Sequence, residues 1–297
     1  MSARDRYATP AAFRRALTDR LKGAAEVGRW NLQELQRQVA YDRLIERLYL
    51  TDDGWIVKGA TALLARDLGV RGSLDVDLYR EVAREVAEDE LRRSAASDLG
   101  DWFTFEIGGG TPMGDRVVRL PVDSRIGATT WVAFHVDLVG ADLRMTGQPE
   151  DVPPLARGVI PEVAQRGYRA YPLVDHIADK VAATYERHGD DSRPSTRFRD
   201  LVDLVAIVTG ASVAAAAQAD ALRSEFDRRG LALPRNFDVP DRALWGPGYA
   251  AEAARSLLAT ARTLDEALAV VRPFVDPLLS GAATGSWDRA MRTWVVA

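Results

Sequence analysis

The sequence of 297 residues contains no cysteine. This absence excludes disulfide bonds, thiol nucleophiles and thiolate metal ligands. Histidine is also scarce, because only His135, His176 and His188 are present. Their separations do not match a metal-binding spacing such as H-x₃-H, so the histidines give no sign of a metal centre.

Long apolar runs are missing as well, since no stretch approaches the roughly 18 residues of a membrane span. Residues 1–20 carry charge throughout and lack the apolar core of a signal peptide. We therefore expect a cytoplasmic protein without a membrane partner. With 47% hydrophobic and 28% charged residues, the composition is that of an ordinary globular protein with one large domain or two modest ones.

The net charge of −4 argues weakly against a nucleic-acid partner, but only if the charge is spread evenly. Acidic residues concentrate between Glu81 and Glu90, whereas basic residues crowd the first forty positions. A basic surface is therefore compatible with an acidic total, although a solvated arginine-rich helix face explains the same pattern equally well. The basic positions are Arg4, Arg6, Arg14, Arg15, Arg20, Lys22, Arg29 and Arg37.

Hydrophobic periodicity predicts a mixed α/β half followed by a helical half. Glycine-rich 108–110 and the segment 124–130 predict turns of an antiparallel meander, and four prolines in 146–161 predict a linker or loop. The predicted helices span 11–50 (in pieces), 59–68, 80–99, 173–188, 197–209, 212–229, 249–261 and 263–279. The predicted strands span 55–57, 74–79, 102–107, 116–122 and 131–138.

Two short motifs carry the chemistry. Lys58 and Gly59 precede the helical sequence Ala-Thr-Ala-Leu, and a glycine at a helix start lets a phosphate approach free backbone N–H groups. Asp75 and Asp77 follow on a predicted strand, where residues i and i+2 share one face. Two carboxylates on one face are suited to Mg²⁺ and a triphosphate.

A two-metal phosphoryl-transfer site generally needs a third carboxylate on a neighbouring strand. Asp137 provides one, because it lies on a predicted strand between apolar Val136 and Leu138. An acid there is costly unless it is hydrogen-bonded, bound to metal or exposed at the sheet edge. Both a metal ligand and an exposed strand acid fit the pattern.

Three charged residues stand out in the helical half. Lys180 lies at the border of an apolar helical stripe, where it either snorkels to solvent or reaches a phosphate. Asp200 and Asp203 are neighbours at i, i+3 on one predicted helix. They could orient Lys180 or deprotonate an attacking hydroxyl, although a solvated acidic edge is the common alternative.

Together these segments resemble the AbiEii/MenT family of nucleotidyltransferase toxins of type IV toxin–antitoxin systems. Members carry a Gly-Gly-Thr/Ser-Ala-Leu helix start, then Arg-x-Ser-x-Asp-x-Asp, a helix with a lysine, and Arg-x-x-Asp-Leu-x-Asp-Leu. The matching segments are 59–63, 71–77, Lys180 and 197–204. Ala60 departs from the pattern, because the family usually has a second glycine there.

The resemblance implies an α+β fold, with a DNA polymerase β-like minimal nucleotidyltransferase core and a helical C-terminal domain. The core combines a mixed or antiparallel sheet with helices. We expect residues 1–160 to form this core with the N-terminal helices. Residues 161–297 are then the helical domain that contributes to the active site.

The resemblance also implies a reaction: transfer of NMP from an NTP to the 3′ end of tRNA, with Mg²⁺ or Mn²⁺, which blocks aminoacylation and translation. A cognate antitoxin is the implied protein partner. Ser73 matches a serine that an antitoxin kinase phosphorylates in some members. The resemblance implies catalytic roles for Asp75, Asp77, Lys180 and Asp203, with Asp75 and Asp77 as metal ligands, and the strand pattern adds Asp137 as a third metal ligand. The expected nucleotide contacts are Lys58, Gly59, Thr61, Arg71, Ser73 and Lys180, and the supporting residues are Arg197 and Asp200.

Two other functional hypotheses are compatible with the sequence. The NMP acceptor could be a protein or a small molecule instead of tRNA. Alternatively, the fold could persist in a chain whose catalysis has decayed and that acts through a partner. The intact set Asp75, Asp77, Lys180 and Asp203 favours the enzyme.

Overall fold

The computed structural model describes residues 3–296 except positions 71, 115, 142, 143, 162, 164 and 190. The chain divides into two compact units. The first comprises Met1–Arg66, Gly72–Leu143 and Glu150–Ala170, and the second comprises Asp67–Arg71, Arg144–Pro149 and Tyr171–Ala297. The main boundary thus lies ten residues beyond the expected 160/161, because residues up to Ala170 pair with the sheet of the first unit.

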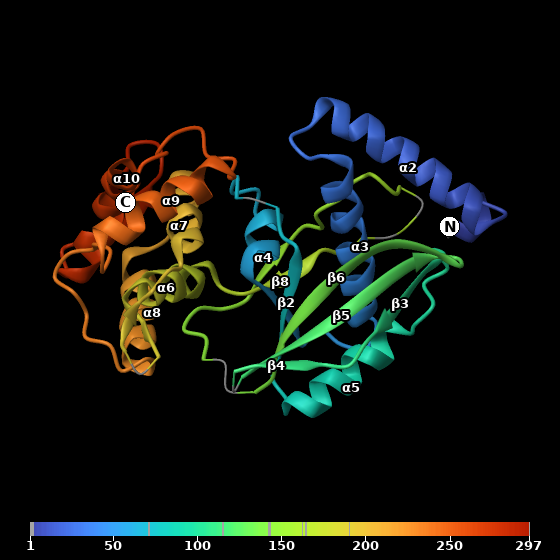
Figure 1. Ribbon diagram of the computed structural model, residues 1–297, viewed down its shortest axis with the longest axis horizontal. Helices are drawn as coiled ribbons and strands as arrows, with labels where there is room; N and C mark the ends of the chain where they lie inside the picture. Colours follow the sequence, from blue (N-terminus) through green and yellow to red (C-terminus); the bar gives the residue numbers. More distant parts are fainter. Residues whose placement is uncertain are drawn as a thin grey trace. The chain divides into compact units, whose positions relative to one another are not determined.

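The first unit combines a mixed sheet with helices (Figure 1). Its helices are α1 (Ala3–Arg6), α2 (Pro10–Val27), α3 (Leu32–Leu48), α4 (Gly59–Ala65) and α5 (Arg84–Ala95). Its strands are β1 (Trp55–Lys58), β2 (Asp75–Arg80), β3 (Phe103–Ile107), β4 (Thr111–Met113), β5 (Val117–Ile126), β6 (Thr129–Val139), β7 (Glu150–Val152) and β8 (Tyr168–Ala170).

The strands follow the order β3-β5-β6-β2-β1-β8-β7, with β4 paired to β5. The β2–β6 and β1–β8 pairs are parallel and the other pairs are antiparallel. The turn predicted over 124–130 is shorter than expected. Strand β5 continues to Ile126, because Gly127, with φ of +60°, closes a two-residue turn before Thr129.

The linker or loop predicted at 146–161 is interrupted by one short strand, and residues 153–161 form no helix or strand. Strand β7 begins at Glu150 and pairs with β8, and prolines 153 and 154 follow its end, where they remove no ladder donor. The next two backbone N–H groups, of Leu155 and Ala156, donate to the buried carboxylate of Asp42 on α3 at 3.0 and 2.8 Å. These bonds attach the segment to the first unit.

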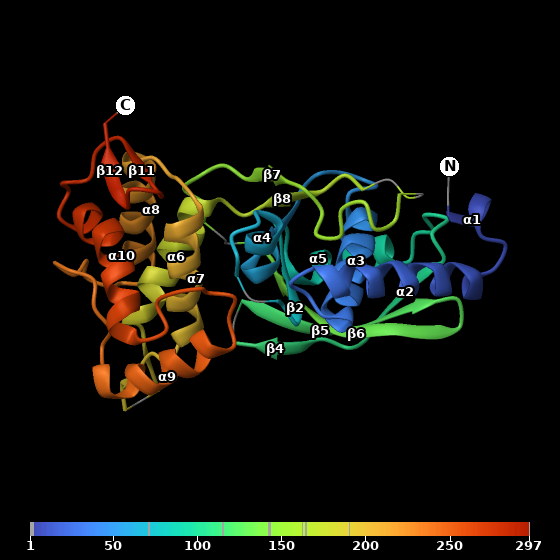
Figure 2. The same cartoon turned by 90° about the horizontal axis from the view of Figure 1, so that it is seen from above.

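Alternation along the strands gives the sheet two different faces. Val76 and Leu78 of β2, like Val136 and Leu138 of β6, are buried in one core with residues of α3 and α5. Figure 2 shows α2, α3 and α5 on one side of β5 and β6. The intervening residues of β2 and β6 therefore point to the opposite face, and they include Asp75, Asp77 and Asp137.

The second unit is mainly helical, as the periodicity predicts. Helix α9 begins earlier than expected, at Arg242, because the Asp241 carboxylate caps it by accepting from the Leu244 N–H at 3.0 Å. The helices are α6 (Leu173–Tyr185), α7 (Phe198–Gly210), α8 (Ala215–Arg228), α9 (Arg242–Ala254) and α10 (Leu264–Leu279), and the short strands are β9 (Arg187–His188), β10 (Arg193–Pro194), β11 (Ser286–Asp288) and β12 (Thr293–Val295). None of the helices in the described part of the chain combines the length and the apolar character that crossing a membrane requires.

Candidate active site

The acidic face of the sheet gathers residues from three adjacent strands. Asp75 and Asp77 are partly buried on β2. Asp77 lies opposite Asp137 of the parallel strand β6 and opposite Lys58 of the antiparallel strand β1. Asp75 lies opposite His135, whose Nδ1 is 3.5 Å from Asp75 Oδ1. The structure thus brings together four of the predicted residues and adds a histidine.

Gly59 forms the turn from β1 into α4. Its φ is +58°, in the region that favours glycine. A Cβ at this position would lie 1.9 Å from Asp77 Oδ2. The glycine therefore leaves the space that the Asp77 carboxylate occupies.

Two hydroxyl groups fix the start of β2. The Thr61 hydroxyl, which is fully buried, donates to the carbonyl of Asp75 at 3.2 Å, and the Ser73 hydroxyl donates to the same carbonyl at 2.6 Å. The Tyr41 hydroxyl donates to the Ser73 carbonyl at 3.2 Å. Burial raises the pKa of Tyr41 above its usual range, and the Asp75 and Asp77 charges act in the same direction, so Tyr41 stays a donor. Nucleotide contacts of Thr61 and Ser73 stay predictions.

Arg119 of β5 joins the acidic face. Its Nε and Nη2 donate to the two oxygens of Asp137 at 2.8 and 2.7 Å, and Nη2 also lies 3.5 Å from Asp75 Oδ2. The hydrogen bond to Asp137 raises the pKa of Arg119 further above its usual range, so the guanidinium is charged at all relevant pH values. Asp137, predicted as a third metal ligand, thus has both oxygens engaged by an arginine.

Sequence reasoning missed Arg119 and His135. Alternation along the predicted strands places each on the polar face, but their partners follow from the register of β5, β6 and β2. Arg71, predicted as a nucleotide contact, lies outside the described residues. Among the residues that are described, no group of three or more His, Cys, Asp or Glu side chains is placed to hold a metal ion.

The second unit contains a separate charged cluster. Lys180 of α6 is buried, and its Nζ donates to Asp200 Oδ1 at 2.9 Å and to Asp203 Oδ2 at 2.7 Å, both on α7. Arg197 donates to the second oxygen of Asp200. Burial opposes the charge of Lys180, but the two aspartates more than offset it and raise its pKa. Burial likewise raises the pKa of Asp200, but Lys180 and Arg197 outweigh it and lower that pKa overall.

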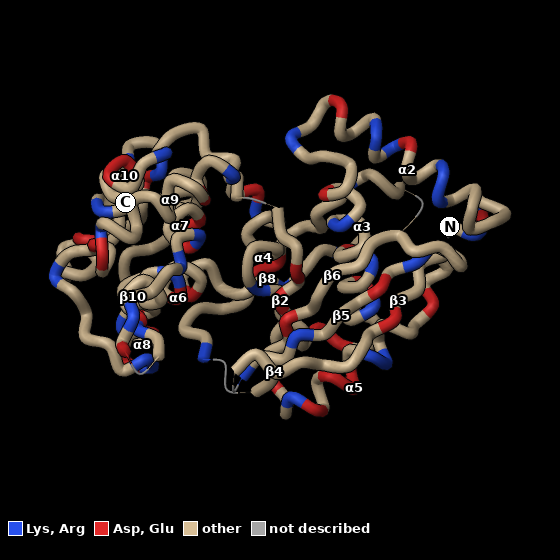
Figure 3. Tube along the Cα trace, viewed as in Figure 1, with Lys and Arg blue, Asp and Glu red and all other residues tan. Residues whose placement is uncertain are grey.

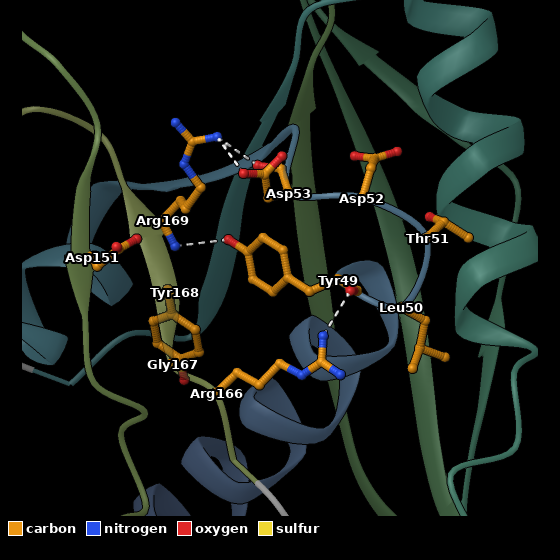
Figure 4. Close-up of a pocket in the computed structure, with 10 residues that line it drawn as sticks. All are labelled: Tyr49, Leu50, Thr51, Asp52, Asp53, Asp151, Arg166, Gly167, Tyr168 and Arg169. Carbon is orange, nitrogen blue, oxygen red and sulfur yellow. Dashed lines mark hydrogen bonds and ion pairs between the residues drawn. The ribbon is translucent and has the colours of Figure 1, made fainter.

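A large cavity of the first unit, of about 650 Å³, contains none of the predicted site residues. It lies where the chain enters β1, and several of its polar groups bond to one another (Figure 4). The Arg169 guanidinium lies 3.4 Å from Asp53, and the Arg169 backbone N–H donates to the Tyr49 hydroxyl at 2.9 Å, while the Arg166 guanidinium donates to the Tyr49 carbonyl. This internal pairing favours a structural role.

A second cavity, of about 580 Å³, lies between α2 and the β5–β6 turn. Arg14, Arg15 and Lys22 line it together with Thr18 and a single acidic residue, Asp19. Arg15 and Lys22 are exposed and Arg14 is partly so. Within the described part of the chain, these three cations take part in no hydrogen bond or ion pair. The cavity therefore has a net positive lining that is open to an anion.

Among solved structures, the fold is similar to that of MenT4, a nucleotidyltransferase toxin from Mycobacterium tuberculosis H37Rv. The TM-score is 0.52 at 16% identity, over 86% of this chain and 99% of that one. JHP933 from Helicobacter pylori gives a lower TM-score of 0.43 at 15% identity, over 83% of this chain and 90% of that one. The MenT4 match confirms the predicted fold class. A comparison with curated proteins gives no significant match.

A family model decides the classification. The model of the AbiEii toxin, a nucleotidyl transferase of type IV toxin–antitoxin systems, matches residues 43–290. This range covers most of the chain and includes all the motifs described above. The chain therefore belongs to the AbiEii family of nucleotidyltransferase toxins.

Proposed function

We propose that this chain transfers NMP from an NTP to the 3′-hydroxyl of tRNA, with Asp75 and Asp77 at the reaction centre. The hydroxyl oxygen attacks the α-phosphorus and its proton passes to water, the bond from that phosphorus to the oxygen bridging the β-phosphate breaks, and pyrophosphate leaves. The observation that carries this proposal is the shared face of the two aspartates beside Gly59 and Lys58. Family membership supports it.

The donor chemistry of the acidic face fits Mg²⁺ or Mn²⁺. Asp75 and Asp77 offer carboxylate oxygens, the ligands that these ions prefer, from one face of one strand. The side chain of Asp75 is 33% exposed, so ligand can reach it. Bound there, a divalent ion would neutralise charge on the phosphates and polarise them.

Gly59→Ala is predicted to reduce transfer at least tenfold. The left-handed backbone alone should cost about 1–2 kcal/mol of stability, and the new Cβ would displace the Asp77 carboxylate. Urea unfolding and a transfer assay measure the two effects. Gly114→Ala is the matched control, because Gly114 has φ of +74° with nothing within 4 Å of the added Cβ. Equal activity in both variants would show that Asp77 does not need the glycine.

The basic lining of α2 supports a polyanionic acceptor. Figure 3 shows lysine and arginine positions at intervals along this helix. Arg14, Thr18 and Lys22 recur every four residues, so they follow one face of the helix, and with Arg15 they line one cavity. Unpaired cations in a row suit the phosphate backbone of RNA, which gains affinity by releasing counterions.

Reversing Arg14, Arg15 and Lys22 to glutamate is predicted to weaken RNA binding and to flatten its salt dependence. The logarithm of the RNA-binding constant falls linearly with the logarithm of the salt concentration, and each lost phosphate contact should reduce the steepness of this line by about 0.7–0.9. Binding of NTP should be unchanged, because the acidic face is formed by strands and contains no residue of helix α2. RNA binding measured between about 50 and 200 mM salt tests this. A wild-type slope in the variant would assign the RNA to another surface.

The identity of the acceptor is tested by locating the transferred label on the tRNA. Purified protein is incubated with each NTP, labelled at the α-phosphate, and total tRNA. We expect label at the 3′ end, and periodate oxidation of the terminal ribose should prevent labelling. Equal labelling of oxidised tRNA, or label only on protein or small molecules, would reject tRNA 3′-end transfer. Such an enzyme would act in the cytoplasm and need a cognate antitoxin to restrain it.

A further inference from the structure

We propose that Arg119 binds the nucleotide phosphates and that Asp137 serves to hold it in place, instead of ligating a metal ion. This inference rests on the proposed function. It assigns a nucleotide-binding residue that the motifs of the sequence do not contain, and it changes the role of the third carboxylate on the acidic face.

The bonds between the two side chains leave Asp137 with little capacity for a metal. Arg119 Nε and Nη2 donate to different oxygens of Asp137, at 2.8 and 2.7 Å. This paired geometry is the strong and directional form of an arginine–carboxylate contact. The two residues also face each other in the β5–β6 register, so the sheet itself fixes their separation.

The charges on this face make the arginine useful. Asp75 and Asp77 share one face of β2, and Asp137 lies opposite Asp77 on the parallel strand β6, so the three carboxylates would repel one another and a triphosphate. Arg119 offsets the charge of Asp137 and reaches within 3.5 Å of Asp75. A cation thus lies directly beside the carboxylates proposed to hold metal.

Part of the guanidinium remains available to a ligand. Asp137 uses Nε and Nη2, so it does not engage Nη1, and the Arg119 side chain is 35% exposed. A planar guanidinium whose direction is fixed by a carboxylate is suited to phosphate recognition. We therefore place a triphosphate oxygen against Nη1 of Arg119, beside the Asp75/Asp77 pair.

The alternative is that Asp137 turns from Arg119 to a metal when nucleotide binds. The two hypotheses differ in whether removing Asp137 weakens the binding of NTP or the binding of the metal ion. If Asp137 is an anchor, removing it should impair NTP binding through Arg119 and leave metal binding intact. If it is a metal ligand, its removal should weaken metal binding directly.

The test measures two equilibria on full-length variants Arg119→Ala, Asp137→Asn and the double variant. Binding of a non-hydrolysable α,β-methylene NTP is measured by calorimetry, and binding of Mn²⁺ alone by electron paramagnetic resonance. Arg125→Ala is the matched control. Arg125 lies on the same strand with the same 35% exposure, and it pairs with Glu106 of the neighbouring strand.

We expect Arg119→Ala to weaken NTP binding about 10- to 100-fold, as for one charge-assisted contact. Asp137→Asn should weaken it in the same direction, and the double variant should be no worse than Arg119→Ala. Mn²⁺ binding should stay within about threefold of wild type, and Arg125→Ala should match wild type in both measurements. The double variant also keeps the test valid if an unpaired Asp137 destabilises Arg119→Ala, because it removes both charges.

The inference is overturned if Asp137→Asn weakens Mn²⁺ binding tenfold or more, or if Arg119→Ala binds NTP like wild type. Either result, obtained while the wild-type chain binds NTP and transfers NMP, leaves the proposed function standing. A wild-type chain that neither binds NTP nor transfers NMP would instead remove the proposed function, and the role of Arg119 with it.

Discussion

Replacing Asp75 or Asp77 by asparagine is expected to reduce NMP transfer by about 10³-fold or more. A divalent ion on a phosphoryl group contributes several kcal/mol to the transition state, and each 1.4 kcal/mol corresponds to about tenfold in rate. Asparagine keeps the shape of aspartate but removes the charge that the ion needs. Transfer of α-phosphate label under saturating NTP measures the effect.

The fold should change little in these variants, because both side chains lie on the polar face and outside the buried core. Asp123→Asn is the matched control. Asp123 lies on β5 two positions beyond Pro121 and is exposed on the same face as Arg119. Full activity of Asp75→Asn would exclude a metal role for this residue, and a collapse of far-ultraviolet circular dichroism would indicate a structural one.

Lys180→Met is expected to destabilise the second unit by about 3–5 kcal/mol. Removing one partner of a buried ion pair leaves the other charge uncompensated, which here applies mainly to Asp203, because Asp200 keeps its bond to Arg197. Asp200 and Asp203 would both lose their shared lysine inside the helix pair α6–α7. Urea unfolding followed by circular dichroism measures the loss.

The triple variant with Lys180→Met, Asp200→Asn and Asp203→Asn should recover most of this stability, because the three buried charges are removed together and the Arg197 side chain, which is 55% exposed, can be solvated. Its activity then separates the two roles of the cluster. A stable but inactive triple variant supports the predicted functions of Lys180 and Asp203. A stable and active one would make the cluster purely structural.

The pH dependence of this cluster has a defined sign. The pKa of Asp200 is lowered in the folded state, so its contribution is present above its ordinary pKa of 3.8 and is lost as pH falls through the folded value. The pKa of Lys180 is raised, so its contribution is present below its ordinary 10.5 and is lost as pH rises through the folded value. Between about pH 5 and 9 the cluster should therefore stabilise the unit uniformly.

Local patterns predict much of the fold and the centre of the site. Period-two alternation in β2 places Asp75 and Asp77 on one face, and helical spacing predicts the helices of the second unit. Patterns of this kind depend only on neighbouring residues, which is why they can be read from one sequence.

Features that depend on contacts between residues far apart in the sequence cannot be predicted from such local patterns. Arg119 becomes part of the site only because β5 lies opposite Asp137 in register. Strands β7 and β8 have three residues each, too few for a periodic signal, and they form by pairing with the sheet. Lys180 lies at the edge of an apolar stripe in the sequence, but the two aspartates of α7 allow it to be buried.

The central claim is that the chain moves a nucleotide and not a single phosphate. The direct measurement supplies wild-type protein, a divalent ion and total RNA with NTP labelled at either the α- or the γ-phosphate. The account predicts that α-label is transferred to RNA and that γ-label is released as pyrophosphate, with both lost in Asp75→Asn. Transfer of γ-label to any acceptor, or α-label transfer that persists unchanged in Asp75→Asn, would contradict it.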